Sequence, residues 1–397
     1  MTTETGGLFT GLEPIQTDSL LRLIQLAAED DRPGKIDVGV GVYRTSNGAT
    51  PILSAIKKAE KILWETQETK AYLGMSGDKK YAELLKPIVF GDDLAQMDGL
   101  IGLQTPGGCG ALTLGFMLAK AANPATRVLV GTPTWANHPP VIRGAGLEIV
   151  EYDYYLKGET RIDFDAMMAA FDAARPGDVA LLHGCCHNPT GADLDAGQWA
   201  KVRAKCAEKG IIPFVDIAYQ GLGDGIDEDA EGLRGLVHAC DEVIVAQSCD
   251  KNFGVYRDRV GCLFVKTGSE ERAKVVNSHI MQIARTMWSM PPDHSAAAVR
   301  IILESDELRA EWLDELDMMR GRIVDLRKRI ASSDPRLAYI ADQKGMFSMM
   351  PLSPEQVEKL RIDHAIYMAD SGRFNVCGMA DEDVDRFCNA VLEAMDG

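Results

Sequence analysis

The segment SCDKNFGVYRDRVG (248–261) carries a lysine, Lys251, directly after a run that has the composition of a buried strand. A lysine at such a position can be desolvated, and a desolvated ammonium loses its proton more readily. The neutral amine is the form that attacks an aldehyde. Arg259, eight residues later, offers a forked and permanently charged group that suits an anion. Taken alone, Lys251 is more simply interpreted as a solvated lysine in a loop.

Four other segments place chemically useful residues after predicted strands: CCHNPTG (185–191), DIAYQG (216–221), TPTWANH (132–138) and GGCGAL (107–112). The last is a glycine-rich turn that opens a helix, an arrangement that suits a phosphate group. Each segment also has a simpler interpretation, since an Asp after a strand often caps a helix and a Trp is often part of the core. Together they bring Lys, Arg, Asp, Tyr, Asn and Trp to one end of the predicted sheet, which favours a functional site.

The elements that position these segments are short β-rich runs separated by amphipathic stretches such as 194–210. The runs are RVLVG (127–131), LEIVEY (147–152), VALLHGCC (179–186), IIPFVD (211–216), VIVAQS (243–248) and GCLFV (261–265). This alternation predicts an α/β fold with a mostly parallel sheet and helices on both faces. Ligands of such folds bind on the loops beyond the carboxyl ends of the strands.

The pattern changes after about residue 296, where a long helical stretch predicts one or two helices that leave the sheet. A compact tail follows, with MFSMM (346–350), IYMA (366–369) and RFNVCG (373–378) as its expected strands. The sequence shows no internal repeat and no low-complexity linker. We therefore expect a smaller α+β domain that packs continuously on the sheet domain.

Composition excludes several classes of function. The chain has 397 residues, enough for two or three domains, and a formal net charge of −17, which disfavours nucleic acid and anionic membranes as partners. Nine cysteines without framework spacing indicate a reducing compartment, and no motif suggests a metal site. We see no signal peptide in MTTETGGLF (1–9) and no membrane-spanning run. The expectation is a cytoplasmic protein.

In order and spacing, these motifs resemble the class I pyridoxal-phosphate aminotransferases of the aspartate and aromatic (tyrosine) branch. The resemblance runs from GKIDVGVGVYR (34–44) and TKAYLGMSG (69–77) to SGRFNVCG (371–378). It implies the type I fold of pyridoxal-phosphate transferases, with a seven-stranded large domain and a smaller α+β domain. The implied division is an N-terminal arm and part of the small domain (1–46), the large domain (47–305) and the rest of the small domain (306–397). It also implies a homodimer with shared active sites.

The resemblance implies a role for each residue around the cofactor ring. Lys251 would hold pyridoxal 5'-phosphate as a Schiff base and later move the substrate Cα proton. Asp216 would keep the pyridine nitrogen protonated, which makes the ring a better electron sink. Tyr219 and Asn188 would hydrogen-bond the ring oxygen, and Trp135 would stack on the ring.

The phosphate of the cofactor would be held by Arg259, Ser248 and the turn at Gly108 and Cys109, according to the same resemblance. Tyr72 would reach this phosphate from the partner subunit and is also expected to take part in catalysis. Cys109 stands where a Thr is common in the family, so a hydroxyl is missing at this position.

The substrate would be an amino acid and its 2-oxo acid partner, such as 2-oxoglutarate or oxaloacetate, in a ping-pong reaction. Arg373 would clamp the α-carboxylate with help from Asn188 and the backbone of Gly41, while Trp135 lines the same place. Arg285 matches a residue that crosses from the other subunit to bind a side-chain carboxylate. Thr132-Pro133 and Asn188-Pro189 match positions that are cis in the family.

Two departures from the family pattern bear on activity. Asp250 precedes the lysine where a small or hydroxylic residue is usual, and an aspartate facing a phosphate costs about 4 kcal/mol per charge pair at an effective dielectric of about 20. Asp250 could reduce this cost if it turned away, were protonated or paired with a cation such as Arg257. We therefore expect that the cofactor still binds, but less tightly than in relatives that have Ser at this position. Ala71 and Met290 replace polar residues near the substrate, which predicts use of both dicarboxylic and aromatic substrates.

Three alternatives remain at this stage. A pyridoxal-phosphate lyase or decarboxylase would share Lys251 and Asp216 but would not need both substrate arginines. A binding protein that keeps the fold without full activity is the second, and Asp250 leaves it open. A nucleotide-dependent dehydrogenase is disfavoured, since no GxGxxG turn has the right strand–helix context. The sequence does not specify the preferred amino donor.

Overall fold

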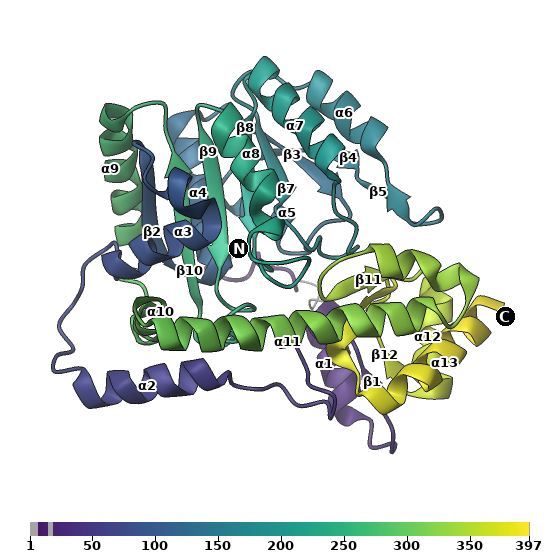
Figure 1. Ribbon diagram of the computed structural model, residues 1–397. Helices are drawn as coiled ribbons and strands as arrows, with labels where there is room; N and C mark the ends of the chain where they lie inside the picture. Colours follow the sequence, from purple (N-terminus) through teal and green to yellow (C-terminus); the bar gives the residue numbers. More distant parts are fainter. Residues whose placement is uncertain (1–6, 15–18, 397) are drawn as a thin grey trace, which may run out of the picture.

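The computed structural model describes residues 7–14 and 19–396. The first six residues, which belong to the segment without a predicted signal peptide and to the expected N-terminal arm, lie outside these ranges. The centre of the fold is a seven-stranded sheet covered by helices, and a second region of short strands and helices lies beside it (Figure 1).

The strand order of the large sheet is β2-β10-β9-β8-β7-β3-β4. Only β10 among these strands runs antiparallel to its two neighbours, β2 and β9, so the prediction of a mostly parallel α/β sheet is confirmed. The strands are β2 (Leu100–Pro106), β3 (Arg127–Thr132), β4 (Glu148–Asp153), β7 (Val179–His183), β8 (Ile212–Ile217), β9 (Val243–Ser248) and β10 (Val260–Lys266).

Helices cover both faces of this sheet, which is why its central strands are apolar on both sides. Successive residues of β8 show the alternation: Phe214 packs 4.6 Å from Phe116 of α4, whereas Val215 belongs to the core on the opposite face. One face carries α4 (Gly107–Ala122), α5 (His138–Gly144) and α9 (Glu270–Met287). The other carries α3 (Lys79–Ala95), α6 (Phe164–Asp172), α7 (Ala196–Lys209) and α8 (Glu231–Ala239).

The six strand runs named from the sequence all correspond to strands of this sheet, with boundaries shifted by a residue or a few. The seventh strand, β2, is missed by the pattern because Gly102, Gln104 and Thr105 interrupt its apolar run. Gln104 is buried and donates through its amide to the carbonyl of Pro292 at 2.6 Å. A tertiary contact therefore compensates for the polar residue inside this strand.

The second region joins segments from both ends of the chain. Ile36 of β1 (Ile36–Asp37) pairs in parallel with Ile366 of β12 (Ile366–Tyr367), and β11 (Phe347–Met349) pairs antiparallel with β13 (Arg373–Asn375). The expected tail strands are thus present. Helices α1 (Ser19–Glu29), α12 (Pro354–His364) and α13 (Val384–Asp396) pack around them. A small hairpin of β5 (Tyr155–Leu156) and β6 (Arg161–Ile162) follows β4.

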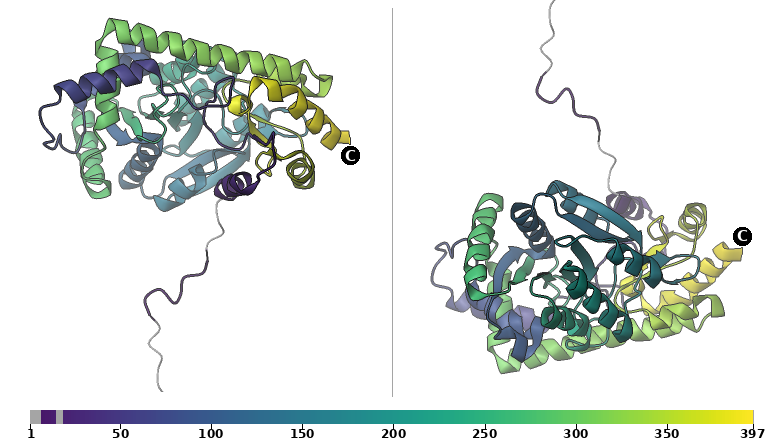
Figure 2. Two further views of the ribbon diagram at one scale, coloured as in Figure 1. Left: turned by 90° about the horizontal axis from the view of Figure 1, so that it is seen from below. Right: turned by 90° about the horizontal axis from the view of Figure 1, so that it is seen from above.

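The long helical stretch predicted after residue 296 forms two helices, α10 (His294–Glu304) and α11 (Asp306–Ala331). Ser305 separates them and caps α11, since its side chain accepts a hydrogen bond from the backbone of Leu308. Helix α2 (Ser54–Thr66) packs against both, and α11 runs from the large sheet to the second region (Figures 1 and 2).

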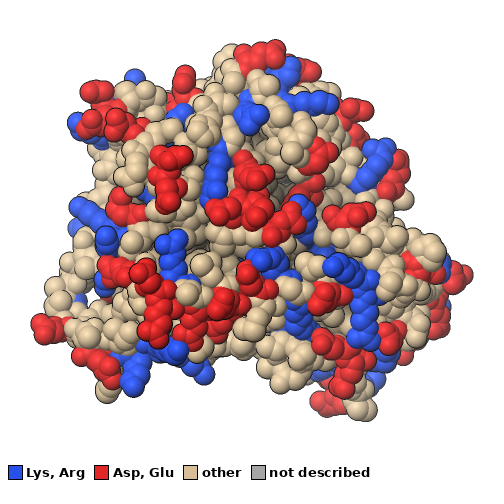
Figure 3. Space-filling model, in the orientation of Figure 1, with Lys and Arg blue, Asp and Glu red and all other residues tan. Residues whose placement is uncertain are grey.

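Charged groups are distributed over the surface. Figure 3 shows Lys and Arg side chains interspersed with Asp and Glu on the face seen in Figure 1. Among the described residues, no helix combines the length and the apolar character needed to cross a membrane.

The carboxyl ends of six strands meet at one edge of the sheet. They belong to β2, β3, β4, β7, β8 and β9, and the start of β10 lies there too because β10 alone runs the opposite way. Pairing of Val260 with Pro106 and of Gly261 with Ser248 places the residue before Val260 next to the start of α4. The Thr132-Pro133 and Asn188-Pro189 bonds at this edge are both cis, as expected.

Helix α11 packs against the loop after β9 and hydrogen-bonds the start of β11. The ring of Trp312, which is fully buried, stacks on Phe253 at 4.2 Å and donates to the carbonyl of Asn252 at 2.7 Å. Near the other end of the helix, buried Arg327 donates to the carbonyl of Phe347 at 2.5 Å and to that of Gly345. One helix thus supports the loop that contains Lys251 and the strand that pairs with β13.

We predict that Trp312→Ala lowers the free energy of unfolding by about 3–5 kcal/mol, because it leaves a large cavity beneath the Lys251 loop. Urea unfolding measures this effect. Trp312→Phe retains an aromatic ring on Phe253 and loses the hydrogen bond to Asn252 and a smaller part of the buried ring, so its loss should be clearly smaller. Equal losses for the two variants would contradict the account.

Candidate active site

A cavity of about 370 Å³ lies at the edge where the strand ends meet. Every residue predicted to contact the cofactor lines this cavity except Tyr72. The cavity is lined by Gly108, Cys109, Leu112, Trp135, Asn137, His183, Asn188, Asp216, Ala218, Tyr219, Ser248, Asp250, Lys251 and Arg259. The topology therefore brings together residues that are up to 151 positions apart in the chain, counting from 108 to 259.

Lys251 provides the amine of the cavity. Its Nζ lies 5.5 Å from the centre of the Tyr219 ring. Burial lowers the pKa of Lys251, while the carboxylates of Asp250 and Asp216 act in the opposite direction. A buried amine with a lowered pKa is neutral at a lower pH than a solvated lysine, so it can act as a nucleophile or a base. Burial also raises the pKa of Tyr219, which keeps its hydroxyl protonated.

Asp216 is held by a histidine that the sequence analysis did not select. His138 Nε2 lies 3.1 Å from Asp216 Oδ2, and His138 Nδ1 lies 2.7 Å from the hydroxyl of Thr134. His138 is fully buried, so the pair is shielded from water. The chain Thr134–His138–Asp216 fixes the carboxylate toward the cavity. His138 lies three residues after Trp135 in a segment already chosen, and that spacing was the available signal.

His183 and His187 form a cluster of rings beside His138. Neither hydrogen-bonds the Asp216 carboxylate within the described structure; the two rings pack 4.0 Å apart, and His187 stacks on Tyr154 at 4.2 Å. His187 Nδ1 pairs with Thr190, whereas His183 Nε2 has no hydrogen-bond partner among the described residues. Burial, and to a lesser extent the interaction with the nearby His138 ring, lower the pKa of His183 to about 3, so the His183 ring stays neutral.

The structure shows what Asp250 contacts. Its carboxylate forms an ion pair with Arg259, while Oδ1 accepts a hydrogen bond from the backbone of Val260 at 3.3 Å. The suggestion that Arg257 neutralises Asp250 is wrong, because Arg257 is exposed and Arg259 takes that place. Asp250 has also not turned away, since its side chain lines the cavity.

Arg373 and Gly41 do not line the cavity. Both lie close to Phe347, which contacts Tyr219 of the cavity wall. The guanidinium of Arg373 stands 4.9 Å from the centre of the Phe347 ring and donates to the carbonyl of Gly39 at 2.7 Å. A side chain at Gly41 would meet Phe347 at 2.8 Å, so glycine permits this close approach. Phe347 in turn packs edge-on against Tyr219 at 6.0 Å. Sequence reasoning did not identify Phe347.

Tyr72 and Arg285 do not reach this cavity within one chain. Tyr72 is 91 % exposed on the loop between α2 and α3, and Arg285 is exposed in the last turn of α9. Ala71 and Met290, which depart from the family pattern near the substrate, are close to Tyr72 and Arg285 in the chain. Ala71 and Met290 line a separate cavity of about 600 Å³, in which the backbone of Leu73 approaches the sulfur of Met290.

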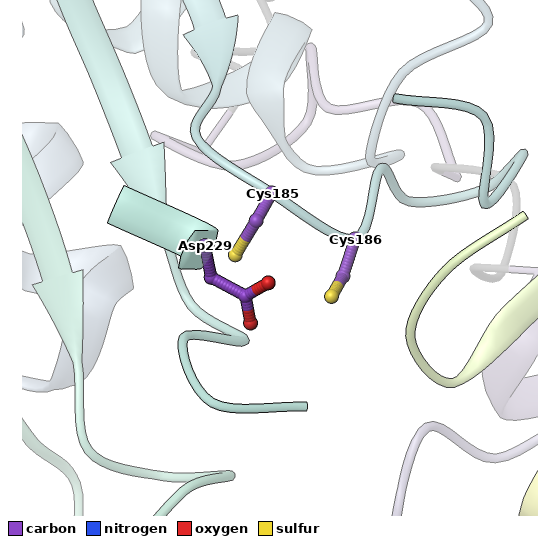
Figure 4. A group of neighbouring side chains, drawn as sticks. All are labelled: Cys185, Cys186 and Asp229. Carbon is purple, nitrogen blue, oxygen red and sulfur yellow. The ribbon is translucent and has the colours of Figure 1, made fainter. Parts of the chain in front are cut away.

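A second group of polar side chains consists of Cys185 and Cys186, which follow β7, and Asp229, which lies in the segment after β8. The three side chains point toward one another (Figure 4). Their ligand-type atoms lie within 4.8 Å. Asp229 already accepts backbone hydrogen bonds from Gly221, Gly223 and Asp224. The contact between the two thiols and burial raise the pKa of Cys185, and burial raises that of Cys186 to about 12. We interpret the group as a junction that holds the loop after β8.

The fold and the cavity define a protein of the α/β class with a lysine among the ends of its strands. Residues 33–391 match the family model described as aminotransferase class I and II, and the chain belongs to this family. It is 46 % identical over 376 residues to the tyrosine aminotransferase of Rhizobium meliloti, covering 94 % of this chain and 96 % of that protein. It is 39 % identical to the aspartate aminotransferase of Salmonella typhi, covering 98 % of this chain and all of that protein.

A solved structure with the same fold is the aromatic-amino-acid aminotransferase of Burkholderia pseudomallei, which is covalently bound to pyridoxal phosphate. The TM-score is 0.95 at 36 % identity, with 98 % of this chain and 100 % of that chain covered. The chain is thus an aminotransferase, and the predicted family and fold are confirmed. The comparisons favour amino-group transfer over the lyase and binding-protein alternatives.

The histidine cluster predicts a pH dependence of stability. Because the folded-state pKa of His183 is depressed from 6.5 to about 3, the unfolded chain binds the proton first as the pH falls. Stability is therefore full above about pH 6.5 and falls by about 1.4 kcal/mol per pH unit per buried histidine below it. We predict that His183→Asn reduces this slope by about that amount between about pH 6.5 and 5.

Urea unfolding across this pH range measures the slope. His279→Asn is the control, because His279 is exposed and its removal should leave the slope unchanged. An unchanged slope in His183→Asn would show that the ring does not remain neutral in the folded protein.

Proposed function

We propose that the protein transfers an amino group between aspartate, glutamate or an aromatic amino acid and a 2-oxo acid such as 2-oxoglutarate or oxaloacetate. The reaction is a ping-pong cycle in which pyridoxal 5'-phosphate alternates with its aminated form. The observation that carries this proposal is the buried amine of Lys251, whose lowered pKa occurs in a cavity that also holds Asp216 and Arg259. The relatives named for tyrosine and aspartate suggest the two substrate classes.

The residues of the cavity fit pyridoxal phosphate. Asn188 Oδ1 and His183 Nε2 are buried at its wall without a hydrogen-bond partner among the described residues, which leaves room for polar groups of a ligand. Gly108 lies so close to Ser248 that a side chain there would meet the Ser248 Cβ at 3.0 Å. Gly107 and Gly108 leave the backbone at the start of α4 without side chains, an arrangement that suits an anion at the helix start. The donor set combines a carboxylate, an amine, a guanidinium and an aromatic wall, as this cofactor requires.

When bound, the cofactor supplies an electron sink for the charge that develops at the substrate Cα. Lys251 Nζ, whose pKa is lowered by burial, would take the proton from the substrate Cα and later return a proton to the reacting group. Asp216, oriented by His138, would keep the ring nitrogen of the cofactor protonated. The Tyr219 hydroxyl and the Asn188 amide nitrogen lie 3.5 Å apart, and both would hydrogen-bond the ring oxygen. Trp135 lines the cavity and would stack on the ring.

The phosphate is held at the start of α4. Arg259 supplies the charge, the Ser248 hydroxyl and the backbone at Gly108 supply hydrogen bonds, and Cys109 lines the subsite. Burial raises the pKa of Cys109, so it contributes a thiol and not a charge. Tyr72 reaches this phosphate from a second subunit.

The substrate α-carboxylate binds Arg373, supported by Asn188 and by the backbone near Gly41. The position of Arg373 over Phe347, which contacts Tyr219, places its charge near the cavity. The clamp fixes the amino group of the substrate toward Lys251 and thereby orients the reacting bond. Arg285 of a second subunit binds the side-chain carboxylate of aspartate or glutamate and is not needed for aromatic substrates.

A homodimer is part of this proposal, since Tyr72 and Arg285 lie outside the cavity of their own chain. Exposed apolar side chains give a second copy a surface to cover. They include Leu8, Phe9 and Leu12 of residues 7–14, which extend away from the rest of the chain in Figure 2, and Trp64 of α2. We place the protein in the cytoplasm, with its nine free cysteines reduced.

The division into residues 1–46, 47–305 and 306–397 is likewise proposed. Its support is that all strands of the large sheet lie between residues 100 and 266. Ile36 pairs with Ile366, so the first segment belongs with the last.

Absorbance spectroscopy tests the proposal directly. The purified protein should show a visible band of the lysine-bound cofactor that disappears on addition of aspartate, as the aminated form accumulates. Lys251→Ala should lack this band and lose activity by about a thousandfold or more, because the base is removed with the covalent link. A protein that consumes aspartate without aminating 2-oxoglutarate would contradict amino-group transfer.

Arg285→Ala tests substrate choice and subunit sharing together. We predict that kcat/KM for aspartate falls by about a hundredfold while that for phenylalanine changes little, because only aspartate has a second carboxylate to bind. An equal fall for both substrates would exclude this role.

Mixing this variant with Lys251→Ala after partial unfolding and refolding creates hybrid dimers. If Arg285 acts across the interface, one site of each hybrid regains both residues and aspartate activity returns. If Arg285 acts within its own chain, no hybrid site is complete and the activity stays low.

A further inference from the structure

The carboxylate of Asp250 is buried inside the subsite that the proposed function assigns to a phosphate. Asp250 is 2 % exposed, and its hydrogen bonds go to neighbouring groups of the protein. Oδ2 pairs with Arg259 Nη1, Oδ1 accepts from the Val260 backbone at 3.3 Å, and the Asp250 backbone donates to the Ser248 hydroxyl at 3.2 Å. The same arginine and serine are the side chains that would hold a phosphate.

The ion pair stands at the first residue of α4. Gly107 has a φ of +70°, and a side chain there would meet Arg259 Nη2 at 2.5 Å and Asp250 Oδ2 at 3.4 Å. The amino end of a helix attracts negative charge, through its unpaired N–H groups and its dipole. Asp250 thus places a carboxylate where the fold favours an anion.

The charges around the cavity show why this matters. Of the residues that line the cavity, Arg259 and Lys251 are the ones that can carry a positive charge besides His183, which is neutral. Lys251 is the amine that must become neutral for its chemistry. Arg259 is therefore the cation available to a phosphate within one chain, and Asp250 is already paired with it.

We propose that Asp250 is an internal anion that holds Arg259 in the absence of cofactor and competes with the phosphate when cofactor binds. The aminated cofactor consequently leaves the enzyme between the two half-reactions and must be rebound from solution. This inference rests on the proposed function.

The two forms of the cofactor respond differently to this competition. The aldehyde form is retained by its covalent bond to Lys251, so a weakened phosphate subsite has little effect on its loss. The aminated form has no bond to the protein and depends on the phosphate, ring and Asp216 contacts alone. The competition with Asp250 therefore acts selectively on one half of the cycle.

Retention of the aminated cofactor tests the proposal without measuring activity. The loaded protein is converted with excess glutamate and passed through a desalting column at set times, and the cofactor left on the protein is read from its absorbance. Asp250→Asn and Asp250→Ser should lose it about tenfold more slowly than the native chain. Asp258→Asn, which removes a charge from the same loop without touching Arg259, should behave as the native chain. Equal rates in all four proteins would overturn the inference.

Thermal unfolding of the cofactor-free and cofactor-loaded forms provides a second readout. Removal of the Asp250 charge should lower the melting temperature of the free form, which loses the ion pair, and raise that of the loaded form, which loses the competitor. A merely structural carboxylate would lower both, and that result would overturn the inference. If no variant takes up pyridoxal phosphate at all, the proposed function fails instead.

Discussion

The proposed chemistry depends on a lysine amine whose pKa is lowered by burial and which still lies among the charges that a cofactor needs. Burial lowers the pKa of Lys251, and Asp216 and Asp250 act against that effect. The balance holds only if each carboxylate is engaged elsewhere, Asp216 by His138 and Asp250 by Arg259. The sheet topology satisfies this condition, since every one of these residues lies at or just beyond a strand end, or in the first turn of the helix after it.

Much of this arrangement can be predicted from sequence, because strand-end motifs are local. Alternating apolar runs reveal the buried strands, and the turns that follow them carry Asn188, Asp216 and Lys251. Parallel strands then bring these turns to one edge without further information. For this reason the residues expected around the cofactor line one cavity, even though the strand β2 beside them was not recognised.

The contacts that the sequence did not reveal are those between side chains from different elements. His138 reaches Asp216 from α5. Phe347 of β11 lies beneath Arg373 of β13, the strand with which β11 pairs. Pairing of Asp250 with Arg257 was one of three possibilities considered, but antiparallel pairing of β10 turns Arg259 toward Asp250. Each depends on distances between segments, which no local pattern contains. Tyr72 and Arg285 go one step further, because their proposed contacts require a second chain.

Helix α11 adds a geometric consequence. Trp312 fixes the loop that carries Lys251, and Arg327 fixes the strand whose Phe347 lies beneath Arg373. Fifteen residues separate these two anchors, which corresponds to about 22 Å along a helix. The helix thus sets the distance between the loop of Lys251 and the strand of Phe347. One residue inserted between Trp312 and Arg327 would rotate one of them about 100° around the helix axis relative to the other. A whole inserted turn would restore their relative orientation but increase the distance between them by about 5 Å. A change in the length of α11 between these two residues would therefore displace the loop and the strand relative to each other.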